Sequence, residues 1–308
     1  MSNQGLPGFG YEPTDREEYE QFATISVADS AAPAAYPPKI DLSWKMTPVK
    51  DQGSYGSCVG FALCSMIEIV PIGIGVLQDE SERFIWYNSK NADGMGNPNS
   101  DRGTFISTAV GTTQSLGSCW EIRCPYSNPL ATPPPSAYTQ GMNMRVTRAY
   151  RLTGTTLDHY KAMLSIGWPV VVGFDIFGDA AYQRRYIFGD YTRRTGIMLM
   201  PPAPRPGRTA GHAVVFVGYD DATRLIKFKN SWGTSWGDHG YGYMPYDYLQ
   251  WTRDAWVLWN QEISLPVSVS GITATATASV AEADESKFVF GEGKQPFETL
   301  SLVAPVSG

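Results

Sequence analysis

Residues 48–70 read PVKDQGSYGSCVGFALCSMIEIV, a polar, glycine-rich loop that runs directly into an apolar stretch. The pattern predicts a loop that turns into a buried helix, with the thiol of Cys58 at the helix N-terminus. The unpaired N–H groups and the dipole at that end favour the thiolate, which is the reactive form of cysteine. Cys58 is therefore a candidate nucleophile, and the alternative is a small buried hydrophobic side chain.

The composition is that of a large globular protein. The chain has 308 residues, of which 43% are hydrophobic and 18% charged, enough for one large domain or two lobes. Because the net charge is −6 and the sequence has no Lys/Arg-rich run, we do not expect a nucleic-acid partner. No stretch approaches 18 uninterrupted apolar residues, so we expect no membrane span.

The first residues carry neither a basic region nor an apolar core of the kind that secretory signals have. We therefore expect the protein to stay in the cytoplasm or to be exported by a signal-independent route, and the sequence does not distinguish these. Four cysteines are too few for a disulfide framework, and nothing in the sequence requires an oxidising compartment.

Three regions differ in composition. Residues 1–38 hold an acidic segment followed by an Ala/Pro-rich linker with little helical tendency. Residues 39–263 are globular in texture, with one lobe over about 39–135 and another over about 136–263, joined at a proline-rich break. Residues 264–308 are rich in Ser, Thr, Ala, Val and Glu, which predicts a loosely attached low-complexity tail, although 288–291 and 297–304 could add an edge strand.

Hydrophobic periodicity indicates the fold class of the globular region. Apolar residues at helical spacing predict helices over 58–70, 81–90 and 105–116. Short β-branched and aromatic runs predict strands over 169–174, 213–219, 225–229 and 255–263. A helix-rich first half and a strand-rich second half predict an α+β protein with two lobes, with the functional site in the cleft between them.

A thiol nucleophile needs a base, and the chain has three histidines. His159 lies in a polar stretch and His239 in a glycine-bounded turn, whereas His212 stands at the start of a buried strand. Asn230 ends the alternating strand that follows, and antiparallel pairing would bring its amide oxygen within reach of the His212 imidazole. That contact would fix the tautomer and aim the other ring nitrogen at the thiol. A core histidine and a turn-capping asparagine are the alternatives.

Two further side chains fit this arrangement. Gln52 lies six residues before Cys58, so its amide and the backbone N–H of Cys58 could form a two-donor oxyanion hole. Trp232 follows Asn230 closely and could shield the contact between His212 and Asn230 from water. Each of the two residues alone has an ordinary alternative, a solvated glutamine and a core tryptophan.

Together these motifs resemble the papain family of cysteine proteases. The matching pieces are VKDQG at 49–53, GSC at 56–58, GHAV at 211–214 and NSWGTSWG at 230–237, in the family's order over about residues 39–263. Prokaryotic members are the most similar, to judge from FIWYN at 84–88 and DRG at 101–103. The resemblance implies a helical N-terminal lobe and an antiparallel, β-barrel-like C-terminal lobe with the active site in the cleft between them.

The resemblance also implies roles for individual residues. Cys58 is the expected nucleophile, His212 the general base and then acid, Asn230 the orienting residue and Gln52 an oxyanion donor. The expected substrate-binding residues flank them. Gly103 matches a glycine of the non-primed cleft, and Ala210 borders the pocket for the second residue before the scissile bond; Gly211 and Trp232 complete the set. Because Gly103 and Ala210 are small, that pocket is expected to be roomy and apolar.

The sequence departs from the family at two positions near the nucleophile. Tyr55 stands where members usually have a disulfide-forming cysteine, and Val59 where they usually have tryptophan. Cys119 and Cys124 flank a Glu-containing stretch that ends in Pro-Tyr, and they could form a small disulfide loop or, less readily, ligate zinc. The resemblance implies no metal and no cofactor.

The expected function is that of an endopeptidase that hydrolyses peptide bonds through a covalent acyl-enzyme. Family members commonly carry a longer helical pro-domain, whereas here about 38 residues precede the enzyme body. We expect residues 1–38 to lie across the cleft as an intramolecular inhibitor, the alternative being a disordered extension. Two other functions stay open: a catalytically silent peptide-binding relative, and a transpeptidase or ligase that uses the same triad.

Overall fold

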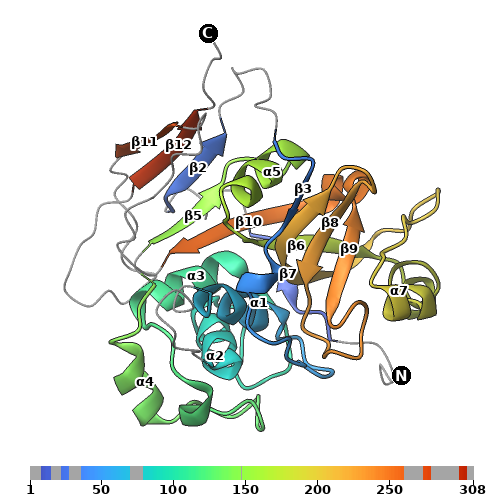
Figure 1. Ribbon diagram of the computed structural model, residues 1–308. Coiled ribbons are helices and arrows are strands. Elements are labelled where there is room, and N and C mark those ends of the chain that lie inside the picture. The colour runs from blue at the N-terminus through green and yellow to red at the C-terminus, as the bar shows by residue number, and fades with distance from the viewer. Residues whose placement is uncertain are drawn as a thin grey trace.

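The helices of the N-terminal half form one side of the molecule. The computed structural model describes residues 8–14, 22–27, 36–69, 79–146, 148–259, 273–278 and 298–303. The expected helices are present as α1 (Cys58–Ile67), α2 (Glu82–Ala92) and α3 (Ile106–Ser115), followed by α4 (Pro135–Gly141). All residues of α1 are buried because α2, α3 and the sheet surround it (Figure 1). The side chain of Ser81 accepts a hydrogen bond from the N–H of Phe84, which caps α2 where the sequence predicts its start.

The strands of the C-terminal half form a large, mostly antiparallel sheet. Its order is β11 (Thr273–Ala278), β12 (Glu298–Val303), β2 (Thr24–Val27), β5, β10, β6, β7, β8 and β9, and β3 pairs with β7 off this path. The four expected strands are present, and β7 begins several residues earlier than predicted. The central bounds are β3 (Lys39–Asp41), β5 (Arg148–Leu152), β6 (Val170–Phe177), β7 (Arg208–Asp220), β8 (Leu225–Lys229), β9 (Tyr241–Pro245) and β10 (Thr252–Trp259). The α+β class predicted from the sequence is confirmed.

Short helices lie between the strands and the larger helices. They are η2 (Ser43–Lys45), η4 (Glu121–Arg123), α5 (Leu157–Ser165), α6 (Ala180–Tyr182), η5 (Gln183–Ile187), α7 (Asp190–Thr195) and η6 (Tyr246–Trp251). Among the described residues, no helix is both long and apolar enough to cross a membrane.

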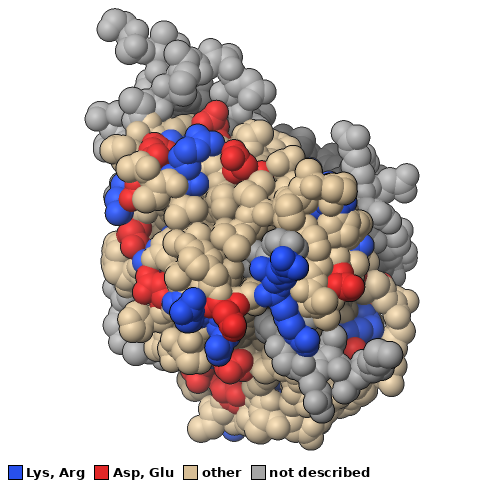
Figure 2. All heavy atoms as spheres, turned by 90° about the vertical axis from the view of Figure 1, so that its right-hand side faces the viewer, with Lys and Arg blue, Asp and Glu red and all other residues tan. Residues whose placement is uncertain are grey.

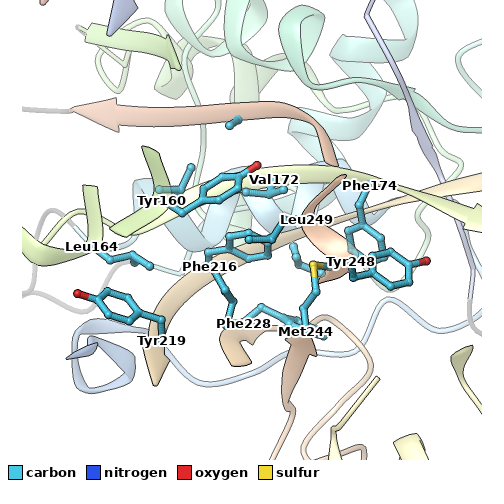
Figure 3. Packing of buried hydrophobic residues seen from close by; sticks show 14 of the residues in the cluster. Tyr160, Leu164, Val172, Phe174, Phe216, Tyr219, Phe228, Met244, Tyr248 and Leu249 are labelled. Carbon is cyan, nitrogen blue, oxygen red and sulfur yellow. The ribbon is translucent and has the colours of Figure 1, made fainter. Parts of the chain in front are cut away.

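Two large apolar clusters form the core. One lies within the sheet-rich half, where Phe174, Phe216, Phe228, Met244 and Tyr248 converge from neighbouring elements (Figure 3). The other joins α1 to the sheet, because buried side chains of α1 and α3 pack against those of β6, β7 and β10. The start of α1 is therefore held rigidly against the strands that carry the other candidate site residues.

The two terminal regions contribute further strands, most of which were not expected from the sequence. In the N-terminal region, β1 (Tyr11–Glu12) pairs parallel with β4 (Thr104–Phe105), and β2 (Thr24–Val27) pairs with β5. In the region 264–308, expected as a loose tail with a possible edge strand over 297–304, β12 (Glu298–Val303) lies within that segment and pairs with β2. β11 (Thr273–Ala278), which was not expected, pairs with β12 at the sheet edge. Alternating Thr and Ala in β11 suits a pleated strand, which explains the difference. The rest of that tail lies outside the described residues.

Candidate active site

The sulfur of Cys58 lies at the first residue of α1, where the sequence predicts it. The side chain is fully buried, and burial raises the pKa of its thiol to about 11. The backbone N–H groups of Ala213, Gly10 and Val59 are directed at the sulfur and partly oppose this rise. The helix end thus offers donors for a thiolate, but in this arrangement the thiol is the stable form.

His212 and Asn230 lie side by side on the paired strands β7 and β8. The Nε2 atom of His212 is 2.8 Å from the Oδ1 atom of Asn230, so the contact expected from antiparallel pairing is present. Within the described residues the Nδ1 atom of His212 has no hydrogen-bond partner. Burial lowers the pKa of His212 to about 4, although the bond to Asn230 opposes this, so the ring is neutral at pH 7.

Aromatic rings enclose the bond between His212 and Asn230. The ring of Trp232 stacks on the imidazole with centroids 4.6 Å apart and planes 25° apart, and Phe174 meets it edge-on from β6. Trp236 in turn packs edge-on against Trp232. Trp232 therefore lies where it shields the hydrogen bond from water, as the sequence suggested.

Gln52 is fully buried in the loop before α1. Its Nε2 atom donates to the carbonyl oxygens of Tyr55 at 2.7 Å and Gly8 at 2.9 Å. Its Oε1 atom accepts from the hydroxyl of Ser231 at 2.5 Å, which fixes the amide so that the donors face the site. The sequence analysis did not assign a role to Ser231, which is 179 positions from Gln52 in the chain.

The expected substrate-binding residues border a segment of the chain itself. A Cβ atom on Gly103 would lie 2.6 Å from the carbonyl oxygen of Gly10, and one on Gly211 would lie 2.4 Å from that of Tyr11. Ala210 is half-buried beside Gly211. These glycines therefore permit a backbone to pass closely over the site.

That backbone is residues 8–14, which we call the cleft segment. The N–H of Thr104 donates to the carbonyl of Gly10 at 2.9 Å, and β1 continues alongside β4. The ring of Phe9 contacts His212, Trp232 and Phe188, with centroids 5.5–6.0 Å away. The alternation GFGY at 8–11 was the available sequence signal, because glycines mark close backbone approach.

A partly buried ionic cluster adjoins the loop that carries Gln52, and the sequence pattern did not indicate it. The ammonium of Lys50 contacts the carboxylates of Glu68 at 3.0 Å, Glu82 at 2.7 Å and Asp79 at 2.5 Å. Burial alone would lower the pKa of Lys50, but Glu82 and Glu68 raise it overall, so the side chain stays charged. This cluster ties the loop that carries Gln52 to α2.

Cys119 and Cys124 are free thiols in this structure, so the disulfide considered from the sequence is not formed. Their side chains are hydrogen-bonded to each other and buried against Phe84 and Ala137. No group of three or more His, Cys, Asp or Glu side chains within the described ranges is arranged to hold a metal ion.

On the face shown in Figure 2, basic and acidic side chains are intermixed.

The family model and several proteins similar to this chain are those of cysteine proteases. The family described as papain family cysteine protease matches residues 36–251. An uncharacterized peptidase C1-like protein of Acanthamoeba polyphaga mimivirus is 32% identical over 233 residues, which cover 70% of each chain.

Solved structures agree in fold. Xylellain, a cysteine protease from Xylella fastidiosa, has a TM-score of 0.71 and 29% identity, and the match covers 85% of this chain and 99% of that one. The Amb a 11 cysteine protease of ragweed pollen, solved in its proform, has a TM-score of 0.57 at 20% identity, covering 76% of this chain and 69% of that one. The similarity to the Amb a 11 protease supports only the two-lobed fold. With the family match extending over most of the sequence, this chain belongs to the papain family of cysteine proteases and is a cysteine peptidase.

Proposed function

We propose that this peptidase cleaves peptide bonds with a triad of Cys58, His212 and Asn230, and that the cleft segment holds it latent. The support for the triad is the geometry around His212. Its Nε2 atom is occupied by Asn230, which leaves Nδ1 as the nitrogen that can exchange a proton with a thiol at the start of α1.

In the proposed reaction, Nδ1 of His212 takes the proton of the Cys58 thiol, and the sulfur attacks the substrate carbonyl carbon. A C–S bond forms as the carbonyl electron pair moves to oxygen, which the Gln52 amide and the Cys58 N–H stabilise. The imidazolium then protonates the leaving amine as the C–N bond breaks. Water, deprotonated by His212, hydrolyses the thioester and restores the thiol.

The contacts of the cleft segment carry the proposal of latency. The carbonyl that receives the Gln52 hydrogen bond belongs to Gly8, whereas the group directed at the Cys58 sulfur is the N–H of Gly10. For attack, one carbonyl must meet both the sulfur and the oxyanion donors. Because the two groups are two residues apart, the segment blocks the site without offering a bond for cleavage.

Electrostatics support the same conclusion. With the segment in place, burial favours a neutral Cys58 thiol and a neutral His212 ring at pH 7. Removal of the segment would expose both groups to water, where the helix end and the neighbouring imidazolium favour the thiolate. Release thus uncovers the nucleophile and also activates it. The Amb a 11 cysteine protease, which has the same fold, was solved in its proform.

The test compares the full chain with a released variant, defined as Gly8→Ala combined with Gly10→Ala. Added Cβ atoms would lie 2.0 Å from the Tyr55 carbonyl oxygen and 1.7 Å from that of Gly56, so the segment cannot keep its position. Hydrolysis of a fluorogenic dipeptide amide should be slow in the full chain and at least tenfold faster in the released variant. It should vanish when Cys58→Ala is added to the released variant.

Three other results would change the proposal. Equal activity of the full chain and the released variant would keep the peptidase and remove the latency. Formation of a new amide with an added amine, in preference to hydrolysis, would indicate a transpeptidase or ligase. If neither the full chain nor the released variant hydrolyses the substrate, and Cys58 is alkylated slowly at pH 6, the protein would be a peptide-binding relative. An activated thiol reacts at pH values well below the ordinary pKa of cysteine.

A further inference from the structure

The side chain of Tyr11 is fully enclosed by the enzyme body although it belongs to the short strand β1. It enters a site that we call the Tyr11 site, bordered by Gly173 of β6, Gly211 of β7 and Asp254 of β10. When a segment of the same chain fills a site of the enzyme, its side chain shows what shape and polarity the site can accept. The contacts of Tyr11 therefore carry information about substrates.

Two glycines make room for the ring. A Cβ atom on Gly173 would lie 2.3 Å from the Cζ atom of Tyr11, and one on Gly211 would lie 2.5 Å from its Cδ1 atom. Real Cβ atoms do not approach so closely, so any other residue at either position would displace the ring. The walls of the Tyr11 site thus fit a flat aromatic side chain.

A carboxylate lies at the far end of the ring. The hydroxyl of Tyr11 donates to Oδ2 of Asp254 at 2.5 Å, and Asp254 is 1% exposed. The N–H of Thr14 reaches the same oxygen at 3.4 Å. A short O–H···O hydrogen bond to a carboxylate in a buried setting is among the stronger hydrogen bonds in proteins. The far end of the Tyr11 site is therefore a carboxyl group.

The Tyr11 site is next to the reacting atoms. Gly211 precedes His212, and the N–H of Gly10, the residue before Tyr11, is directed at the Cys58 sulfur. Gly211 also follows Ala210, which the family resemblance puts at the pocket for the second residue before the scissile bond. A substrate side chain close to the scissile bond would enter this site once the cleft segment has left.

We propose that the Tyr11 site is a specificity pocket that selects tyrosine as the second residue before the scissile bond, with Asp254 accepting its hydroxyl; this rests on the proposed peptidase function. Phenylalanine fits the same walls but leaves the buried carboxylate without that donor. Losing the donor to a buried acceptor is unfavourable, so the hydroxyl sets the preference. Asp254 is the specificity-determining residue, and Gly173 and Gly211 set the shape.

The experiment uses the released variant and four fluorogenic dipeptide amides. In all four, arginine is the residue directly before the scissile bond, and the second residue before the bond is Tyr, Phe, Leu or Lys. Tyrosine should exceed phenylalanine in kcat/KM by roughly tenfold or more. Asp254→Asn should reduce this ratio severalfold, because a neutral amide accepts more weakly than a carboxylate. Asp247→Asn, at an exposed carboxylate paired with Arg224, should leave the ratio unchanged.

A phenylalanine substrate cleaved as well as the tyrosine one would overturn the proposal, as would a ratio that Asp254→Asn does not alter. Preference for lysine over tyrosine would also overturn it, since the site would then select charge and not the phenol. Each of these results leaves the peptidase function standing.

A binding measurement keeps the inference testable if none of the four substrates is hydrolysed. A synthetic peptide of residues 8–14 should slow the alkylation of Cys58 by iodoacetamide in the released variant. The Tyr11→Phe peptide should require about a tenfold higher concentration for the same protection. Equal protection by both peptides would overturn the Tyr11 site as a tyrosine pocket, whatever the outcome for catalysis.

Discussion

The two ends of the cleft segment are held by different kinds of contact. Residues 8–10 lie over the candidate catalytic residues, where the carbonyls of Gly8 and Gly10 accept bonds from Gln52 and Thr104 and the ring of Phe9 packs among aromatic rings. Residues 11–14 are held by side chains, above all by Tyr11 on Asp254. In the proposed latent form, residues 8–10 block the active site and residues 11–14 anchor the segment to the enzyme body.

The difference follows from the available space. Over Cys58 the segment passes so close to the loop at 53–56 that no side chain fits at Gly8 or Gly10. Beyond Gly10 the site opens into an enclosure that takes a whole aromatic ring. A substrate must satisfy the same two geometries, a thin backbone at the sulfur and a side chain next to it.

The largest expected effect comes from breaking the blocking end alone. In Gly10→Ala the new Cβ atom would lie 1.7 Å from the Gly56 carbonyl oxygen. Because that oxygen belongs to the backbone, it cannot move away without a large free-energy cost. Alkylation of Cys58 at pH 6, followed by mass spectrometry, should accelerate by on the order of a hundredfold. Gly207→Ala is the matched control, because a Cβ atom there meets nothing within 4 Å. Similar rates in both variants would refute the block.

Titration of His212 sharpens the same contrast. In the full chain burial holds its pKa near 4, so the ring stays neutral as pH falls through 6. Release exposes the ring to water, so its pKa should rise to the ordinary value of about 6.5 or above. In ¹³C-histidine NMR spectra, the midpoint should therefore move upward by about two pH units in the released variant. The other two histidines serve as internal references, and an unchanged midpoint would contradict the proposed cover.

A smaller effect is expected at the buried part of the anchoring end. The hydroxyls of Thr14 and Ser107 are 2.8 Å apart, and Thr14→Val removes one partner and leaves the other unsatisfied. A loss of about 1–2 kcal/mol of segment binding should speed Cys58 alkylation roughly five- to thirtyfold. Thr223→Val, at an exposed turn, provides the comparison and should not alter the rate. An effect as large as that of Gly10→Ala would show that the anchor, and not the block, limits release.

The smallest effect belongs to the exposed rim of the segment. Glu12 and Arg208 form a half-exposed pair at 3.2 Å, and such pairs contribute at most about 1 kcal/mol. Glu12→Gln should change the alkylation rate by no more than about fivefold, and the difference should shrink in high salt. A larger change in the alkylation rate that salt does not reduce would show that the Glu12–Arg208 pair is one of the main contacts that hold the cleft segment.

Much of the site could be predicted because its parts are local in sequence. The start of α1 at Cys58 follows from a glycine-rich loop that meets a continuous apolar run. The proximity of His212 and Asn230 follows from two consecutive strands that pair antiparallel. Gln52 was identified by its distance from Cys58, but the hydroxyl of Ser231 that orients it could not be inferred from spacing alone.

The sequence by itself determined the α+β class, the main helices and strands, and the identity of the residues at the candidate site. Only the tertiary structure decided which residues of the N-terminal region lie in the cleft and which side chain fills the site beside Cys58. Tyr11 and Asp254 are 243 positions apart, and neither belongs to a local pattern that predicts their contact. The physical reason is that periodicity records which face of an element is buried, whereas long-range contacts depend on how the whole chain packs around it.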